Sequence, residues 1–416
     1  MNEETLRRVE AALAEFTVWL AGYGETSWDH QSYFASDLCR RAKALYYSFP
    51  RLGALAVGPM IFSEAFVPSA RKLFYKPQRF PIADAHYTMG FSFLAQRNIR
   101  SEHYRRAVHF LDMLIQTRCP GYTHYGWGYP FNWETRRGVI KAGTPLITTL
   151  PYVYEAFRDV YEIDGKREWL EVMRSIAEHA ISDYWDVEIL PSAFSCSYMP
   201  GTQSSTGVVN ASAYRAFLLT CAGLDFSDER YKRAAEGNLR FVLAAQNEDG
   251  SWPYSHGDER DFVDHFHTCF VLKALAKIEA LSGDSTCTAA IDKGVAYYVK
   301  ALFDENRLPK PFSRAPRLTV YRRELYDYAE CVNVAVLLKG RSQQLDQILE
   351  AVVDDLLANW RKNDGSFRSR KLLLSWDNIP MHRWAQAQLF RSLAFLLHRE
   401  CDDSQEKVVS YSEAVN

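Results

Sequence analysis

The stretch GNLRFVLAAQNEDGSW, residues 237–252, decides the fold because its pattern returns elsewhere in the chain. The positions that recur are Gly237, Phe241, Gln246, Gly250 and Trp252. The first two are filled again 57 residues later, by Gly294 and Tyr298. The stretch LLANWRKNDGSF, residues 356–367, ends in the same kind of loop, an Asp-Gly turn followed by an aromatic residue. Such a loop suits a helix exit at which glycine adopts a positive φ, so the sequence indicates repeated helical units.

Two kinds of helical segment alternate along the chain on both sides of this stretch, from residue 84 onward. The first kind is charged on one face and predicts outer helices over 101–118, 165–184, 227–245, 285–303 and 342–361. The second kind is apolar on nearly every face and predicts buried inner helices over 84–97, 145–163, 207–223, 265–282, 326–339 and 381–399. Because neighbouring hairpins bury one another's faces, we predict an all-α fold, an (α/α)6 toroid of about six helical hairpins.

We expect a single domain over residues 1–416, because no linker rich in Pro, Gly or Ser interrupts the series. Residues 1–80 are expected to complete the ring, with either 3–22 or 34–48 as the missing outer helix. Residues 401–416 are expected to form a flexible tail. The stretch FVPSARKLFYKPQRFP, residues 66–81, has no place in the pattern.

The pattern in 237–252 resembles the QW repeat of terpenoid cyclases and prenyltransferases, toroids in which Gln and Trp tie one hairpin to the next. That resemblance implies an isoprenoid ligand. The Asp-x-Asp-Asp acid of the cyclases is missing, because the nearest string, residues 352–355, reads VVDD on a predicted outer helix. Over residues 84–400 the architecture also resembles six-hairpin glycosidases, polysaccharide lyases and uronyl C5-epimerases, a likeness that implies a saccharide substrate.

Composition and charge limit the kinds of partner that we expect for this protein. Lys and Arg number 49 against 51 Asp and Glu, so the net charge of -2 does not favour nucleic acid. No apolar run approaches the roughly 18 residues of a membrane span, and the charged N-terminus does not fit a secretory signal, so we expect a cytoplasmic protein. The eight cysteines show no zinc-site spacing. We therefore predict no metal and no cofactor, and the oligomeric state stays open.

The loops that lead into the inner helices gather at one end of a toroid, which we call the mouth. In the loop 122–145 we single out as substrate-binding residues Tyr125, Trp127, Trp133, Arg136 and Arg137. Aromatic rings can stack on the apolar face of a sugar, and arginines can hold a carboxylate in a bidentate fork. The alternative is that these aromatic side chains pack over the end of the ring.

Three further loops supply the candidate acids and bases. Asp264 and His267 lie three residues apart at a helix start, where a carboxylate can orient an imidazole as a general base requires, with His265 beside them as a binding residue. Glu330, in an apolar wall, would have a raised pKa as a general acid, and Tyr328 lies near it. The remaining candidates are His382 as a catalytic residue and Asp377, Arg383, Tyr198 and Asn210 as binding residues. For each, a structural hydrogen bond is the alternative.

Six helix N-termini around one mouth favour an anionic ligand. The sequence therefore predicts a carbohydrate-active enzyme for an acidic, uronate-containing saccharide, of epimerase, lyase or hydrolase type. An epimerase or lyase would use His267, Tyr328 or Glu330 as acid and base, with Arg136 or Arg137 on the carboxylate. A hydrolase would pair Glu330 with Asp377 or Asp264. The alternative is a non-cyclising toroid that binds an isoprenoid or a lipid-linked intermediate.

Overall fold

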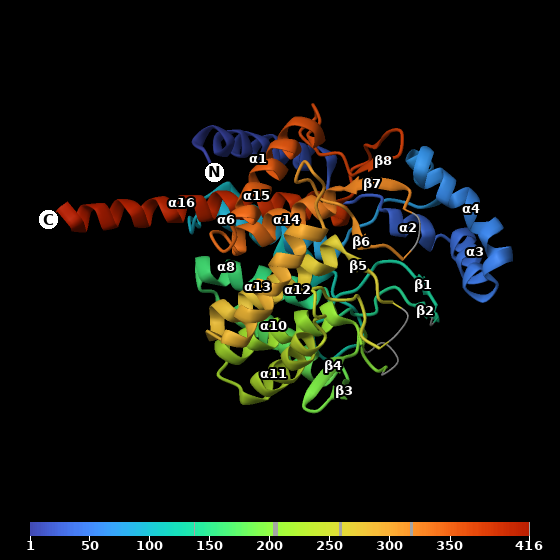
Figure 1. The fold of residues 1–416 in the computed structure, drawn as a ribbon, viewed down its shortest axis with the longest axis horizontal. Coiled ribbons are helices and arrows are strands. Elements are labelled where there is room, and N and C mark those ends of the chain that lie inside the picture. Colours follow the sequence, from blue (N-terminus) through green and yellow to red (C-terminus); the bar gives the residue numbers. More distant parts are fainter. Residues whose placement is uncertain (137, 203–206, 258–259, 317–318, 416) are drawn as a thin grey trace.

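Six helices surround the axis of the molecule in the computed structural model, which describes residues 1–416 except 137, 203–206, 258–259, 317–318 and 416 (Figure 1). These inner helices are α6 (Pro81–Ala95), α8 (Leu150–Asp164), α10 (Val209–Asp225), α12 (His265–Ser282), α14 (Leu325–Leu337) and α16 (Ala387–Val415). Each contacts the next, and α16 returns to α6, so the ring is closed. In α10, for example, 14 of 17 residues are buried, as an apolar helix at the centre of a fold must be.

Six amphipathic helices form the outer layer and alternate with the inner ones along the chain. They are α1 (Glu3–Tyr23), α7 (Glu102–Gln116), α9 (Arg167–Ser182), α11 (Glu229–Ala244), α13 (Ser285–Ala301) and α15 (Gln343–Asp355). Ser101, at the N-cap of α7, accepts a hydrogen bond from the Tyr104 amide, and Asp228 does the same for Arg230 at α11. The predicted (α/α)6 toroid is confirmed.

Two of the repeated loops fasten their hairpins to a neighbour. A Cβ on Gly250 would lie 2.3 Å from the Lys293 carbonyl oxygen on α13, and one on Gly365 would lie 2.7 Å from the Glu15 carbonyl oxygen on α1. Both glycines have φ near +90°, which favours glycine. The loop after α11 thus meets the next hairpin, and the loop after α15 meets the first one. The second of these contacts closes the ring.

The aromatic residue of the repeat fills the space that a glycine leaves on the neighbouring helix. The Trp252 ring lies against Gly294, where a Cβ would be 2.5 Å from it, and its indole donates to the Val242 carbonyl at 3.0 Å. The Gln246 side chain donates to the carbonyls of Gly250 at 3.0 Å and Ala290 at 2.9 Å. The pattern in 237–252 therefore joins α11 to α13 through side chains as well as backbone.

Short strands occupy the connections from outer to inner helices. They are β1 (Trp133–Thr135), β2 (Gly138–Ile140), β3 (Asp186–Leu190), β4 (Ala193–Cys196), β5 (Val263–Asp264), β6 (Phe312–Arg314), β7 (Tyr321–Glu324), β8 (Arg370–Leu372) and β9 (Trp376–Asp377). They pair antiparallel as β1–β2, β3–β4, β5–β6 and β7–β8–β9. Figure 1 shows them on the side away from the C-terminus, where they build the rim of the mouth.

Residues 24–80 contain more than the predicted outer helix. Helix α1 completes the ring, and its Phe16 stacks on Phe390 of α16 with ring centroids 5.3 Å apart. The following helices are α2 (His30–Ala35), α3 (Asp37–Ser48), α4 (Pro50–Phe66), η1 (Pro68–Ala70) and α5 (Arg71–Phe74). We call α2 to α5 the insertion, because they lie outside the ring beside the mouth (Figure 1). The expected tail 401–416 continues α16 as helix to Val415.

The contact of Gly250 with α13 can be tested against a glycine that has the same sign of φ but free space. Gly165 has φ +67° and no atom within 4 Å of an added Cβ. We expect Gly165→Ala to cost about 1 kcal/mol from backbone strain alone, and Gly250→Ala about 2–4 kcal/mol because the clash is added. Urea unfolding of both variants measures the difference, and equal losses would contradict the contact.

Candidate active site

Asp264 and His267 form a hydrogen-bonded pair at the start of α12. Asp264 is the N-cap: its Oδ1 accepts from the His267 amide at 2.9 Å, while its Oδ2 lies 2.6 Å from His267 Nδ1. The carboxylate is buried, and the imidazole keeps 22% of its side-chain surface exposed. Among the described residues, His267 Nε2 has no hydrogen-bond partner. The pair is thus an oriented imidazole with one ring nitrogen available.

Aromatic side chains surround this imidazole. The rings of Tyr254, Phe266 and Phe270 have centroids 4.7, 4.3 and 5.5 Å from that of His267. Phe266 also contacts Tyr326 and Trp384, which stack on each other at 4.4 Å. Residues from the starts of α12 and α14 therefore meet Trp384 of η3 (His382–Gln386), the turn that leads into α16.

Arg383 contacts both Trp384 and Tyr129 of the loop after α7, so this loop also lies at the aromatic cluster. Its guanidinium lies 4.6 Å from the centroid of Tyr129 and 5.0 Å from that of Trp384, and it forms two 2.8 Å hydrogen bonds with buried Asp29. Trp133 packs on Tyr129 with centroids 5.7 Å apart. Burial raises the pKa of Tyr198 well above its ordinary value, and Tyr129, Tyr254 and Arg383 are among the groups that act on it.

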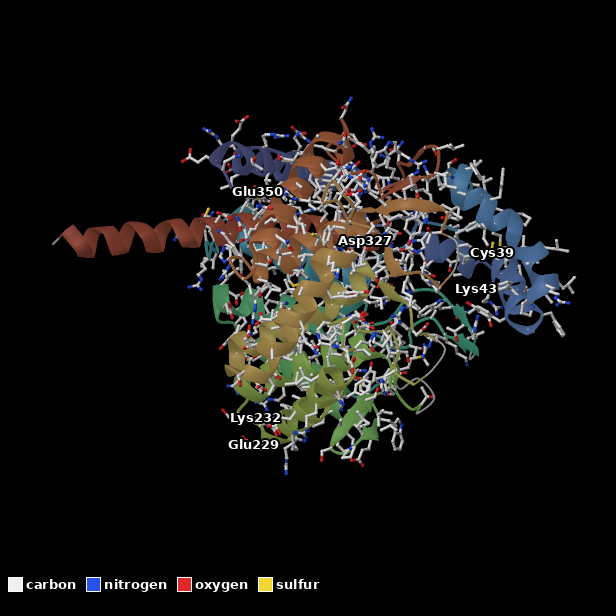
Figure 2. All side chains as sticks on the ribbon, viewed as in Figure 1. Cys39, Lys43, Glu229, Lys232, Asp327 and Glu350 are labelled. Carbon is white, nitrogen blue, oxygen red and sulfur yellow. The ribbon has the colours of Figure 1, made fainter. Side chains whose placement is uncertain are left out.

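Two carboxyl groups that the sequence analysis did not nominate lie near Asp264. Asp327 is 1% exposed, and neither of its carboxyl oxygens has a hydrogen-bond partner among the described residues. Burial, followed by the charges of Glu324 and Asp264, raises the pKa of Asp327 well above its ordinary value. Burial also raises the pKa of Glu324, to about 7, although Arg370 opposes the shift. Figure 2 shows Asp327 among the helices of the ring.

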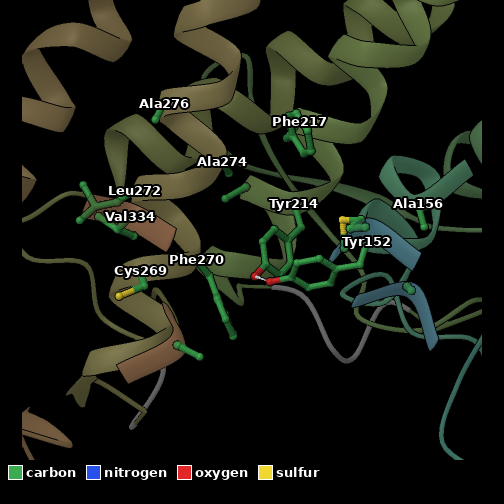
Figure 3. Packing of buried hydrophobic residues seen from close by; sticks show 14 of the residues in the cluster. Tyr152, Ala156, Tyr214, Phe217, Cys269, Phe270, Leu272, Ala274, Ala276 and Val334 are labelled. Carbon is green, nitrogen blue, oxygen red and sulfur yellow. Dashed lines mark hydrogen bonds between the residues drawn. The ribbon is translucent and has the colours of Figure 1, made fainter. Parts of the chain in front are cut away.

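A polar network fills the axis of the ring behind the mouth. Glu330 forms an ion pair with Lys273, whose Nζ also donates to the Tyr152 hydroxyl at 3.1 Å. Tyr152 and Tyr214 share a hydrogen bond between α8 and α10 (Figure 3). Burial lowers the pKa of Lys273 to about 8, while Glu330 acts in the opposite direction. Arg391 adds a second buried cation, 3.2 Å from His86 Nδ1.

Several predicted site residues bond to neighbouring elements instead of joining the Asp264–His267 pair. His265 Nε2 lies 2.7 Å from the Tyr298 hydroxyl on α13, and burial lowers the pKa of His265 to about 3. The Tyr328 hydroxyl donates to Asp355 of α15 at 2.7 Å. These two side chains join an inner helix to an outer one.

His382 and Trp127 likewise bond to neighbouring elements instead of joining the Asp264–His267 pair. His382 lies between the Tyr87 hydroxyl, at 2.6 Å from Nδ1, and the Gly24 carbonyl, at 3.0 Å from Nε2. Burial lowers the pKa of His382 to about 4. Fully buried Trp127 donates to the Leu114 carbonyl at 2.7 Å, just as Trp252 bonds back to α11.

The other predicted residues of the mouth have varied surroundings. Tyr125 accepts a 2.7 Å hydrogen bond from Arg118 and is partly buried. Asn210 is buried at the start of α10, and its Oδ1 has no partner among the described residues. Arg136 is exposed in the β1–β2 turn, and Arg137 lies outside the described residues.

Asp377 belongs to a buried cluster of four charges, the clamp, which joins the insertion to the rim. Arg71 donates to Asp377 at 2.6 Å and to Glu64 at 3.0 Å. Arg370 bonds to Glu64 at 2.5 Å and to Asp377 at 3.1 Å. Burial alone would raise the pKa of Asp377, but the two guanidinium groups lower it overall. Two elements 306 residues apart in sequence are thereby held together.

No group of three or more His, Cys, Asp or Glu among the described residues is arranged to hold a metal ion.

Two surface cavities lie away from His267. One, of about 710 Å³, runs between α13 and α15, and the other, of about 440 Å³, lies beside Tyr184 and Trp185.

Comparison with known proteins supports the fold. No family model and no curated protein matches the sequence. Among solved structures, an unsaturated glucuronyl hydrolase specific for heparin is similar with TM-score 0.61 and 10% identity, over 97% of this chain and 99% of that one. Cellobiose 2-epimerase from Bacillus thermoamylovorans B4167 is similar with TM-score 0.60 and 10% identity, over 77% and 88%. A polysaccharide lyase has TM-score 0.54 and 11% identity, over 78% and 90%.

The clamp predicts that a single neutralising substitution will be costly. Asp377→Asn would leave two buried arginines facing one carboxylate, so we expect a loss of about 3–5 kcal/mol in the free energy of unfolding. Asp354→Asn, which removes the exposed pair with Arg8, is the matched control and should cost about 1 kcal/mol or less. Denaturant unfolding compares them, and a similar small loss in both would show that the clamp contributes little.

The raised pKa of Glu324 predicts that the stability of the protein depends on pH. Its pKa in the folded protein is about 7 against an ordinary value of 4.5, so between these values the native state holds a proton that the unfolded chain has released. The contribution of this group to stability is therefore present below about pH 4.5 and falls as pH rises to about 7. Glu324→Gln should remove that fall, so the variant should gain stability relative to wild type across the window. Urea unfolding at several pH values tests this, and a constant difference would contradict it.

Proposed function

We propose that this chain is a carbohydrate-active enzyme that acts on an acidic saccharide bound at the mouth. The observation that carries the proposal is the Asp264–His267 pair, an oriented imidazole with an available nitrogen inside an aromatic wall. Aromatic faces suit sugar rings, and the start of α10, which has no acidic residue in its first turn, suits an anionic group. The similar solved structures include enzymes named for epimerisation, hydrolysis and lysis of saccharides, which agrees with this class.

In the proposed reaction His267 Nε2 takes a proton from carbon, as at C5 of a uronate. Asp264 holds the ring through Nδ1 and stabilises the imidazolium that forms. The acid would come from the protonated pair of Glu324 and Asp327, because their raised pKa values keep protons available near neutral pH. Glu330 and Tyr328, the first candidates from the sequence, are held by Lys273 and Asp355. When this acid gives a proton to C5 on the opposite face of the sugar, the reaction is an epimerisation; when it gives the proton to the leaving oxygen at C4, the C4–O bond breaks and the reaction is that of a lyase.

The alternative, a toroid that binds an isoprenoid chain, needs an apolar channel. The axis is instead crossed by the Lys273–Glu330 ion pair and by Arg391, and burying an apolar chain beside these charges would cost free energy. The buried polar groups around the axis therefore favour the saccharide. A cytoplasmic location stays a prediction from the sequence.

The test begins by finding the ligand. Thermal shifts are measured with uronate-containing oligosaccharides and, as the competing class, with prenyl diphosphates. We expect stabilisation by the uronates only, followed by turnover seen as exchange of the C5 hydrogen with D2O or as an unsaturated product. Stabilisation by prenyl diphosphates alone would reject the proposal.

On a uronate substrate, His267→Asn should lower kcat by about 10²- to 10⁴-fold with the fold intact. Asp264→Asn should also lower kcat, because asparagine preserves the helix cap but cannot stabilise an imidazolium. His109→Gln, at a partly exposed histidine paired with Glu25 on the outer layer, is the control and should keep full activity. Full turnover in His267→Asn would remove this residue from the mechanism.

A further inference from the structure

The insertion exposes an unusual amount of apolar surface. Nineteen large hydrophobic residues are exposed in the described structure, and ten of them lie between residues 38 and 74. They are Leu38, Phe49, Leu52, Leu55, Ile61, Phe62, Phe66, Val67, Leu73 and Phe74. Leu55 and Phe62 are 76% and 61% exposed. Scattered apolar residues are normal on a protein surface, but a concentration in one short segment indicates a surface that is covered in use.

These side chains cannot turn inward, because the insertion has little interior. Its own core consists of Tyr33, Cys39 and Met60, and α3 packs closely against α4, where a Cβ on Gly53 would lie 2.1 Å from the Tyr46 Cα. Residues 52–63 of α4, LGALAVGPMIFS, contain no charged residue, and the following Glu64 is buried in the clamp. Figure 2 shows Cys39 and Lys43 on this part, outside the ring. The apolar face of α4 is therefore open to solvent along its length.

The segment that carries the apolar face of α4 is also positively charged. Residues 37–80 contain eight Lys or Arg and two Asp or Glu, a net charge of +6 in a chain whose total is -2. Arg41, Arg51, Lys72 and Lys76 are exposed, whereas of the two acidic residues Asp37 is exposed and Glu64 is buried. Apolar side chains flanked by basic ones are typical of segments that lie in the interface of an anionic membrane.

The geometry of the segment fits a surface position. No single helix in the described part of the chain is apolar and long enough to cross a membrane. Helix α4 and the segment Pro68–Phe74 pass that test of length and composition only together, and they are bent by 115°. A bend of this size suits a helical segment that lies along a surface. Because Glu64 and Arg71 fix it to β8 and β9, the segment would move as one body with the rim of the mouth.

We propose that α3 to α5 are a docking surface for an anionic lipid bilayer, with the open face of α4 in the interfacial layer. The charge of the segment is complementary to acidic headgroups, and its apolar side chains would leave water on binding. On this proposal the segment binds one leaflet of the bilayer with its apolar side chains in the interfacial layer.

The experiment uses the full chain and vesicles that contain about 30% phosphatidylglycerol in phosphatidylcholine. Wild type should sediment with these vesicles, bind pure phosphatidylcholine more weakly, and be released as salt rises from about 0.05 M to about 0.5 M. The double variant Leu55→Ser/Phe62→Ser should bind about tenfold or more weakly, because two apolar side chains no longer insert. Arg51→Glu/Lys72→Glu should lose the preference for the anionic lipid.

The control Val18→Ser/Leu224→Ser removes two exposed apolar side chains from α1 and α10, outside the insertion, and should bind like wild type. All of these positions are exposed, so circular dichroism and thermal unfolding should match wild type. Absence of wild-type binding, or equal binding by Leu55→Ser/Phe62→Ser, would overturn the proposal. A concentration-dependent dimer that dissociates in this variant, without vesicle binding, would overturn it in favour of a second copy of the chain.

Discussion

An inner helix that is apolar on every side has to be enclosed on every side, and this constraint governs the structure. A closed ring satisfies it, because each inner helix meets two others and an outer partner. The ring also determines where polar residues lie in the fold. Polar residues collect in the network around the axis and in the connections between helices, and the connections into the inner helices share one end. The mouth is a consequence of burying α10 and its five equivalents.

Most of the buried charges at this end of the ring are paired with an opposite charge. Arg383 pairs with Asp29, and Lys273 pairs with Glu330. The four charges of the clamp neutralise one another in the same way. Asp327 differs from these pairs, because neither of its carboxyl oxygens has a hydrogen-bond partner in the described structure. An unpaired buried polar group is costly and often marks a functional site, and this cost is one reason for the role of acid that we propose for Asp327.

The sequence predicted the toroid because helical periodicity and the repeat around Gly250 and Gly365 are local signals. It did not separate the residues of the site, because that depends on the rotation of each helix within the ring. His265 and His267 are two residues apart, yet the first bonds to α13 and the second lies among the aromatic side chains of the mouth. Asp327 and Tyr328 diverge in the same manner. The clamp joins residues 306 positions apart, which no pattern in a single sequence indicates.

The closure of the ring has a consequence for the nascent chain. His382 bonds to the carbonyl of Gly24, which leaves the ribosome 358 residues earlier. At about 5–20 residues per second, the first helix waits roughly 20 to 70 s for its partner. Throughout that time the faces of α1 and α6 that α16 will cover stay open to other chains. Slower translation would therefore lengthen the time for which these faces stay exposed.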